Sequence, residues 1–291
     1  MTTSTPAARP AIRSVRFDVH DRPFIVIWET TRACELVCRH CRADAVHHRH
    51  PLELTTDEGF GLVDDLAGLG APRPILVLTG GDPFERPDLA VLVRHGADAG
   101  LSVALSPSVT PRLTRDVLAE LREAGASAVS LSLDGATAAT HDGFRGVEGV
   151  WSQTLDAAAT VRELGFRLQI NTTVTRDNAA ELPDVLRRVH DLGAGLWSVF
   201  FLVPTGRGSE LAPLGAHEVE QVLHWLHEVS GVVAIKTTEA PHFRRVVIER
   251  SAAGEGAGGA GVPPLGELHA RLRAATATRF GDVERRVERR R

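Results

Sequence analysis

Apolar and polar positions follow two patterns that alternate along the chain. Short apolar runs rich in β-branched residues, such as residues 24–28, have the composition of strands buried on both faces. Longer segments between these runs repeat their apolar positions at helical spacing. The apolar runs predict strands at residues 24–28, 74–78, 101–105, 128–133, 167–174, 196–203 and 232–237.

The segments with helical spacing predict one helix after almost every strand. Thr55 and Glu58 have the spacing of a capping box, so the first helix is expected to begin there. Asn178 is expected to cap the helix that ends near Leu192. The predicted helices lie at residues 55–69, 88–99, 114–124, 148–164, 178–192 and 217–229.

Strict alternation of strands and helices predicts a parallel sheet with right-handed crossovers. A complete or partial barrel and a doubly wound open sheet both satisfy this pattern. The first strand is followed by cysteines and not by the glycine-rich turn of a dinucleotide-binding fold. We therefore expect an α/β fold, a partial (β/α)6 TIM-like barrel with parallel strands that is incompletely closed.

Composition divides the chain into three parts. Residues 1–22 are expected to form a flexible lead, and residues 23–250 the core barrel. Residues 251–291 begin with a segment of mostly Gly and Ala and end in a charge run, which predicts a linker and a solvated tail. A short amphipathic helix is expected at residues 265–274, and no second domain.

The composition and net charge of the chain argue against several classes of protein. A hydrophobic content of 43% argues against global disorder, and a net charge of −4 gives no reason to expect nucleic-acid binding. No apolar run approaches the roughly 18 residues of a membrane span. The first residues lack the pattern of a secretory signal, so we expect a cytoplasmic protein. In that reducing compartment, clustered thiols typically hold a metal.

All three cysteines of the chain, Cys34, Cys38 and Cys41, lie in one short stretch after the first predicted strand. An odd number of thiols would leave a disulfide framework with one thiol unpaired. Three thiolates can hold an iron–sulfur cluster with one iron open to another ligand. Zinc bound by the same thiolates and His40 is the alternative, although His40 directly precedes Cys41 and is awkwardly placed.

Polar residues, glycines and prolines also follow the other predicted strands. In parallel barrels the loops after the strands meet at one rim, where active sites lie. These loops include Gly80–Pro83, Ser106–Ser108, Ser132–Gly135 with His141, Asp142 and Arg145, Asn171–Thr173, and Pro204–Gly208. The last of these fits a substrate loop or a plain turn equally well. By contrast, His47, His48 and His50 are expected to be solvated, and Trp28 and Trp197 to be core residues.

Cys34, Cys38 and Cys41, with Gly80-Gly81-Asp82-Pro83 after the second strand, resemble the signature of the radical S-adenosylmethionine (radical SAM) superfamily. The segment from Ser132 to Arg145 resembles that of the branches that modify peptides or build haem-type cofactors. The similarity covers roughly residues 22–245. It implies an enzyme in which a [4Fe–4S] cluster reductively cleaves SAM to a 5′-deoxyadenosyl radical that abstracts hydrogen from a peptide or cofactor precursor. An electron donor such as flavodoxin or ferredoxin is implied as a partner, with no nucleic acid or membrane.

The resemblance also implies roles for single residues. Cys34, Cys38 and Cys41 would hold the cluster. His40 would lie against the adenine of SAM, with Leu202 or Val203 as an apolar wall. Gly80 and Gly81 would let the backbone approach the methionine amino group, beside Asp82. Ser132 would bind the ribose, and Arg145 the carboxylate. No residue is assigned as catalytic in its own right.

The chain departs from this family's pattern in two places. Asp82 stands where glutamate is commoner, and no cysteine follows Cys41. Peptide- and cofactor-maturing relatives commonly carry a cysteine-rich extension called SPASM or Twitch, with auxiliary clusters. Either this enzyme uses one cluster, or its C-terminal region is a truncated or altered extension. The alternative from another class is a non-catalytic or degenerate metal- or cluster-binding barrel.

Overall fold

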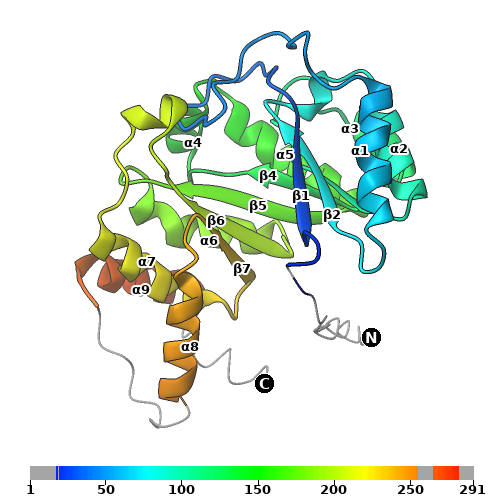
Figure 1. Cartoon of the computed structure of the whole chain (residues 1–291). Helices are drawn as coiled ribbons and strands as arrows, with labels where there is room; N and C mark the ends of the chain where they lie inside the picture. Colours follow the sequence, from blue (N-terminus) through cyan, green and yellow to red (C-terminus); the bar gives the residue numbers. More distant parts are fainter. Residues whose placement is uncertain (1–17, 19, 255–264, 282–291) are drawn as a thin grey trace, which may run out of the picture.

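The computed structural model describes residues 18, 20–254 and 265–281, and its centre is a seven-stranded parallel sheet. The strands are hydrogen-bonded in sequence order, and the first and last are not paired with each other. The sheet is therefore a curled, open partial barrel (Figure 1). The strands are β1 (Ile25–Thr31), β2 (Ile75–Gly80), β3 (Ser102–Leu105), β4 (Ala128–Ser132), β5 (Arg167–Val174), β6 (Leu196–Phe201) and β7 (Ala234–Thr238).

Helices connect consecutive strands and cover the outer face of the sheet (Figure 1). The helices are α1 (Thr56–Gly68), α2 (Leu89–Asp98), α3 (Arg115–Glu123), α4 (Ala138–Arg145), α5 (Val150–Glu163), α6 (Leu182–Asp191), α7 (Ala216–Val229), α8 (Phe243–Gly254) and α9 (Glu267–Phe280). Three 3₁₀ turns, η1 (Pro83–Glu85), η2 (Ala179–Glu181) and η3 (Gly206–Glu210), lie in loops after β2, β5 and β6.

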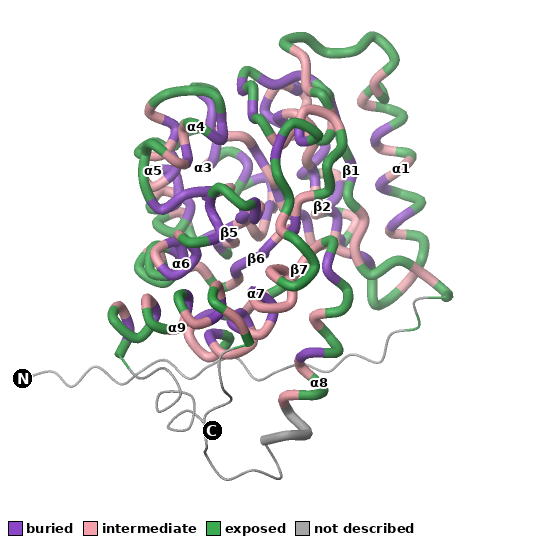
Figure 2. Tube along the Cα trace, turned by 90° about the vertical axis from the view of Figure 1, so that its left-hand side faces the viewer, coloured by how far each residue is buried: buried purple, intermediate pink, exposed green. Residues whose placement is uncertain are grey.

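Burial alternates along the strands and distinguishes the two faces of the sheet (Figure 2). Along β4, Val129 and Leu131 are fully buried, whereas Ser130 and Ser132 are half-buried. Successive strand residues point to opposite faces, so the buried residues face the helices. The other face, which we call the inner face, carries many hydroxyl and amide side chains. Trp28 and Trp197 are buried, as expected, and Trp197 packs edge-to-face on Trp225 of α7.

The sequence-based predictions of fold class are confirmed, and the seventh predicted strand is present as β7, so the sheet has one strand more than a barrel of six units. The capping box is present at Thr55 and Glu58. Asn178, however, makes no capping hydrogen bond, so that prediction was wrong. Its side chain is instead buried between strand ends, where it donates to the carbonyls of Asp134 and Thr173 at 2.8 Å.

Two helices were not predicted. Helix α4 contains Thr140 and Gly143, which weaken the helical pattern, and it begins where the Thr137 hydroxyl accepts from the Thr140 amide. Helix α8 begins at Phe243 and runs through residues 251–254, four positions that were expected to belong to the linker.

Helix α9 differs in length and in role from the short helix expected at residues 265–274. It continues to Phe280 and packs against α6 and α7. Its inward positions include His269 and Thr276, so the apolar spacing is incomplete in the sequence. Thr276 accepts a hydrogen bond from the Trp225 indole at 3.0 Å. Residues 1–17 and 19 of the lead predicted at residues 1–22 lie outside the described residues, as do residues 255–264 and 282–291 of the predicted linker and tail.

Candidate functional site

The three cysteines lie in a closed loop that begins where β1 ends. The Cys34 amide donates to the Val46 carbonyl at 2.8 Å, and the Val46 amide donates to the Arg32 carbonyl at 3.0 Å. This short parallel bridge between Ala33 and Val46 closes residues 33–46 into what we call the cysteine loop. The loop therefore has a fixed base on the sheet, which holds all three thiols at the rim.

The thiols are free and largely shielded from solvent. Cys34 and Cys38 are buried, whereas Cys41 is half-buried. The Cys34 sulfur lies 3.4 Å from the Ser108 hydroxyl, and the Cys38 sulfur lies 3.6 Å from Nη1 of Arg145. Burial raises the pKa of the Cys34 thiol, and its hydrogen bond with the Ser108 hydroxyl partly offsets this rise. These contacts bring groups from the loops after β3 and β4 onto the cysteine loop.

Gly80 and Gly81 lie where the end of β2 passes closest to the cysteine loop. A Cβ on Gly80 would be 2.2 Å from the carbonyl oxygen of Thr31, and one on Gly81 would be 2.3 Å from that of Ala33. Gly80 also has φ of +136°, which disfavours other residues. The structure thus supplies a reason for both glycines, namely that backbone at the end of β1 and the start of the cysteine loop occupies the space of a side chain.

Asp82 follows these glycines and is fully buried. Its carboxylate accepts from the Phe84 amide at 3.1 Å, the Ser108 amide at 3.3 Å and the Thr110 hydroxyl at 2.9 Å. Burial outweighs these hydrogen bonds and raises the pKa of Asp82 to about 6. The side chain therefore fastens the loop after β2 to the loop after β3, a role that the sequence did not indicate.

A buried ion pair between Asp134 and Arg145 lies on the other side of Cys38. Asp134 also accepts from the Thr173 amide at 2.7 Å. Burial disfavours both charges, but each partner stabilises the other, so the pKa of Asp134 stays below its ordinary value and that of Arg145 above it. Both groups are charged at neutral pH, and Arg145 directs positive charge toward Cys38.

His40 packs its ring on Phe144 with centroids 4.5 Å apart. The residue is partly exposed, but its Nδ1 atom is buried and has no partner among the described residues. Burial and then the charge of Arg145 lower the pKa of His40 to about 4, so the ring is neutral at neutral pH. A buried polar atom without a partner generally indicates a missing ligand or water.

Arg207, from the loop after β6, reaches across the open side of the barrel to the cysteine loop (Figure 1, yellow and blue segments). Its Nε donates to the Cys38 carbonyl at 3.0 Å, and Nη1 donates to that of Ala45 at 3.2 Å. Gly206 makes this approach possible, because a Cβ there would lie 2.6 Å from the Cys41 carbonyl oxygen. The Nη2 atom is buried without a partner among the described residues.

The structure thus brings together most of the residues that the sequence singled out. The cysteines, His40, Gly80, Gly81 and Arg145 surround one rim, and Ser132 faces it from the inner face, where its hydroxyl bonds to no described residue. Ser108 and Arg207 were not assigned roles, although their positions after β3 and β6 were the available signal. His47, His48 and His50 are exposed, as expected.

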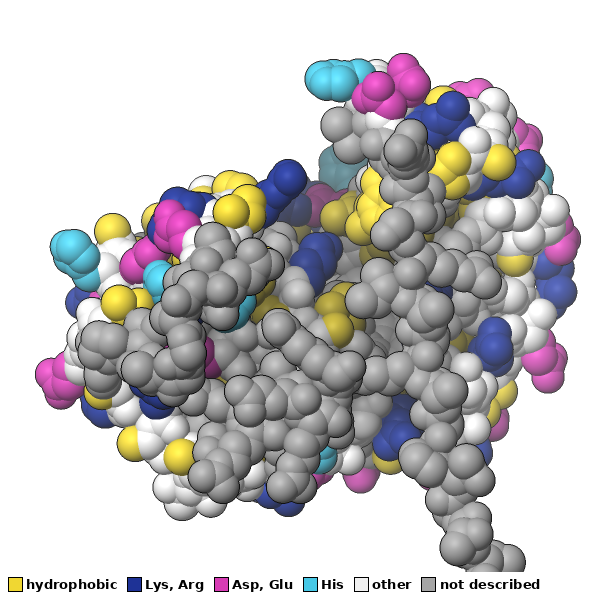
Figure 3. Space-filling model, turned by 90° about the horizontal axis from the view of Figure 1, so that it is seen from below, with side chains coloured by type: hydrophobic (Ala, Val, Ile, Leu, Met, Phe, Trp, Pro, Cys, Tyr) yellow, Lys and Arg dark blue, Asp and Glu magenta, His cyan; other side chains and the backbone are white. Residues whose placement is uncertain are grey.

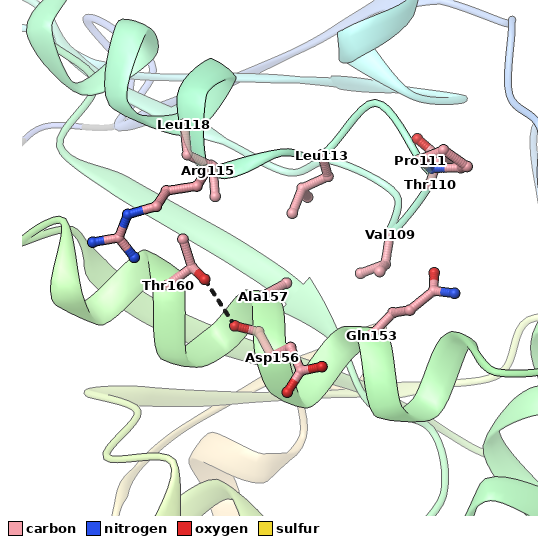
Figure 4. A pocket seen from close by; sticks show the side chains of 10 residues that line it. All are labelled: Val109, Thr110, Pro111, Leu113, Arg115, Leu118, Gln153, Asp156, Ala157 and Thr160. Carbon is pink, nitrogen blue, oxygen red and sulfur yellow. Dashed lines mark hydrogen bonds between the residues drawn. The ribbon is translucent and has the colours of Figure 1, made fainter.

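A cavity of about 290 Å³ lies away from this rim, between α3 and α5 on the outer side of the barrel (Figure 4). Val109, Leu113, Leu118 and Ala157 form its apolar walls, and Asp156 and Thr160 lie on α5. Thr110 connects it to the rim through Asp82. No titratable side chain of the rim lines this cavity, so we do not assign the cavity to the site.

The face of the molecule seen in Figure 3 shows no concentration of one charge. Seen from below, acidic and basic side chains are interspersed over the part of the surface that is not grey (Figure 3). Within the described ranges, no helix is both long enough and apolar enough to span a membrane. The cytoplasmic location stays a prediction.

Comparison with known proteins identifies relatives that are named as synthases of haem-type compounds and as a peptide cyclase. The chain is 41% identical to AdoMet-dependent heme synthase of Methanosarcina barkeri, over 79% of this chain and 65% of that protein. It is 32% identical to Fe-coproporphyrin III synthase of the same organism, over 66% and 47%. It is 35% identical to PqqA peptide cyclase of Bradyrhizobium diazoefficiens, over 59% and 44%. The chain thus spans less than two thirds of the length of each.

A solved structure supports the fold. Streptococcus suis SuiB bound to S-adenosylmethionine superposes with a TM-score of 0.64 at 13% identity, over 78% of this chain and 53% of that one. The superfamily match itself covers residues 28–189, from within β1 to within α6, and therefore includes the entire cysteine loop. The chain belongs to the radical SAM superfamily of enzymes.

Proposed function

We propose that this chain binds a [4Fe–4S] cluster through Cys34, Cys38 and Cys41 and uses it, with SAM, to modify a cofactor precursor. The observation that carries the proposal is the cysteine loop itself. It holds three free thiols at the rim, against Gly80 and Gly81 on one side and Arg145 on the other. When bound, the cluster and SAM supply a 5′-deoxyadenosyl radical that abstracts hydrogen from the substrate.

The chemical types of the residues at the rim suit a [4Fe–4S] cluster and SAM. Thiolates are the usual ligands of iron–sulfur clusters, and three of them leave a site for SAM. Among the described residues, no three candidate ligands already surround one point, so the thiols must turn from their present contacts to bind a cluster. The Nδ1 atom of His40 and the Nη2 atom of Arg207, both buried without partners, can hydrogen-bond to a ligand there.

Each nearby residue has a task that its position allows. Arg145 carries the positive charge next to Cys38 and can stabilise its thiolate or an anionic group of SAM. Neutral His40 can offer the ring face that does not contact Phe144 to an adenine. Ser132 can donate to a ribose, and the carbonyls of Gly80 and Gly81 can accept from an amino group. Asp82 acts through the loops it fastens and is not proposed to contact SAM.

A tetrapyrrole precursor is the substrate class that the comparisons favour. The relative named heme synthase is more similar to this chain, and over more of it, than the relative named peptide cyclase. A peptide is the second class, and the test below separates the two. The non-catalytic alternative is not favoured, because the relatives are named as synthases and cyclases and the chain keeps all three cysteines.

Anaerobic reconstitution with iron and sulfide tests the proposal. We expect roughly four irons per chain and formation of 5′-deoxyadenosine that depends on dithionite. Cys38→Ala should abolish both, whereas Arg244→Met, a change on the exposed side of α8, should affect neither. Tight binding of a single zinc without SAM cleavage would overturn the proposal. Turnover of Fe-coproporphyrin III supports a tetrapyrrole substrate, and turnover only of a precursor peptide contradicts it.

A further inference from the structure

Lys236 on β7 is the only lysine in a chain that has 33 lysine and arginine residues in total. It is exposed, and its ammonium group has no hydrogen bond or ion pair to any described residue. Many of the described arginines, by contrast, bind a carboxylate or a backbone carbonyl. A cation left without a partner on a strand of the barrel is available to a ligand.

The sheet register places Lys236 on the inner face, in one row with the proposed ribose residue. Ser132 is paired with Asn171, Asn171 with Ser198, and Ser198 with Lys236. The Ser198 hydroxyl lies 3.5 Å from that of Thr238, two residues beyond Lys236, which confirms that these side chains share a face. The neighbouring Trp197 points the other way, onto α7.

The charges on this part of the inner face are few. From the level of Glu29 toward the rim, the described strand positions facing inward carry hydroxyl, amide or apolar side chains, such as Thr79 and Gln169, apart from two. Glu29 on β1 is one, and it is paired with Arg42. Lys236, at the opposite edge, is the other. Within the part of the chain that the structure describes, Lys236 is therefore the unpaired charge that a substrate lying across this face would meet.

We propose that Lys236 binds a carboxylate of the substrate. This inference rests on the proposed function, because it takes SAM to occupy the rim near Ser132. Three strand spacings separate Ser132 from Lys236, roughly 14 Å, so an anion at Lys236 belongs to the substrate and not to the ribose end of SAM. An ammonium group next to hydroxyls forms a charge-assisted hydrogen bond with a carboxylate, and tetrapyrrole precursors carry carboxylates at their edges.

Selective labelling of the single lysine tests this directly. Lys236 and the α-amino group are the primary amines that an amine-reactive acetylating reagent can label, and mass spectrometry of the peptide that contains Lys236 measures the rate there. We expect Fe-coproporphyrin III, whose propionates are free, to slow acetylation of Lys236 at least tenfold, with the α-amino group as internal control. The tetramethyl ester of the same compound should protect less than twofold. Equal protection by acid and ester, or no protection by the acid, would overturn the proposal.

Two variants give an independent measurement. Lys236→Met keeps the length of the side chain and removes its charge, so binding of Fe-coproporphyrin III, measured by its absorbance change, should weaken about 10- to 100-fold. Lys236→Arg should stay within about threefold, because the charge is retained. Equal affinities for the two variants would contradict the inference. Failure of the unsubstituted chain to cleave SAM would refute the proposed function, while labelling still decides the role of Lys236.

Discussion

The rim around the cysteine loop and the inner face of β6 and β7 differ in how their polar groups are satisfied. At the rim, Asp82 accepts three hydrogen bonds and Asp134 is paired with buried Arg145. On the inner face, Lys236 has no partner among the described residues, and the Ser198 hydroxyl has only a 3.5 Å contact with that of Thr238 there. The carboxylates of the rim are held in place before any cofactor binds, and the inner face of β6 and β7 keeps groups available. A site that must orient a reactive cofactor needs side chains that are held in place, and a site that admits a substrate needs polar groups that are available to bind it.

Breaking the buried ion pair should have the largest effect on the rim. Asp134→Asn keeps the shape of the side chain but leaves Arg145 buried without a countercharge. We expect a loss of about 3–5 kcal/mol in the free energy of unfolding, measured with urea. Glu163→Gln is the matched control, because the Arg115–Glu163 pair is more than half exposed and its loss should change stability by about 1 kcal/mol or less. Equal losses would mean that the rim pair contributes no more than a surface pair.

Gly81→Ala tests whether the glycines serve the cysteine loop. Its Cβ would lie 2.3 Å from the Ala33 carbonyl and 2.7 Å from that of Arg32. The loop must therefore move, which should lower stability by about 1–3 kcal/mol even without SAM, and iron binding should fall with it. Gly61→Ala in α1 meets nothing within 4 Å, so it should be neutral or stabilising by up to about 1 kcal/mol. Unchanged stability with weaker SAM binding would show instead that Gly81 serves the cosubstrate alone.

Sequence reasoning succeeded where the chemistry is local in the chain. The three cysteines and the Gly80-Gly81 pair are short motifs, and the repeated strands predicted a parallel partial barrel. It did not anticipate the contacts of Asp82 or Arg207, because their partners lie far away in the sequence. Ser108 touches Cys34 across 74 positions, and Arg207 reaches Cys38 across 169. Such partners are defined only once the loops meet at the rim.

Asp82 should make the stability of the rim depend on pH. Burial raises its pKa from 3.8 to about 6, so the folded protein holds this proton more tightly than the unfolded chain. Its stabilising contribution is fully present below about pH 4 and is lost as the pH rises through about 6. His40 and His141, whose pKa values burial lowers to about 4, act in the opposite direction.

The comparison with Asp82→Asn isolates this effect, since both histidines remain in the variant. Between about pH 4.5 and pH 6.5, the unsubstituted protein should lose about 1–2 kcal/mol more stability than the variant. Urea unfolding at the two pH values measures the difference. Parallel pH profiles would mean that the carboxylate is as easily ionised in the fold as in the unfolded chain.

Arg207 offers the smallest and most local test, because it joins the loop after β6 to the rim. Arg207→Met removes two donated hydrogen bonds, to Cys38 and Ala45, but leaves the backbone bond from residue 207 to Cys41. We expect amides of the cysteine loop to exchange with solvent about tenfold faster, with little change in global stability. Arg244→Met and the amides of α1 are the controls. If exchange in the cysteine loop stays unchanged, the rim's rigidity comes from β1 to β4 alone. If exchange in the cysteine loop becomes faster, the half of the barrel that holds Lys236 also helps to hold the thiols. Substrate binding on that half is then coupled to the proposed cluster site through the side chain of Arg207.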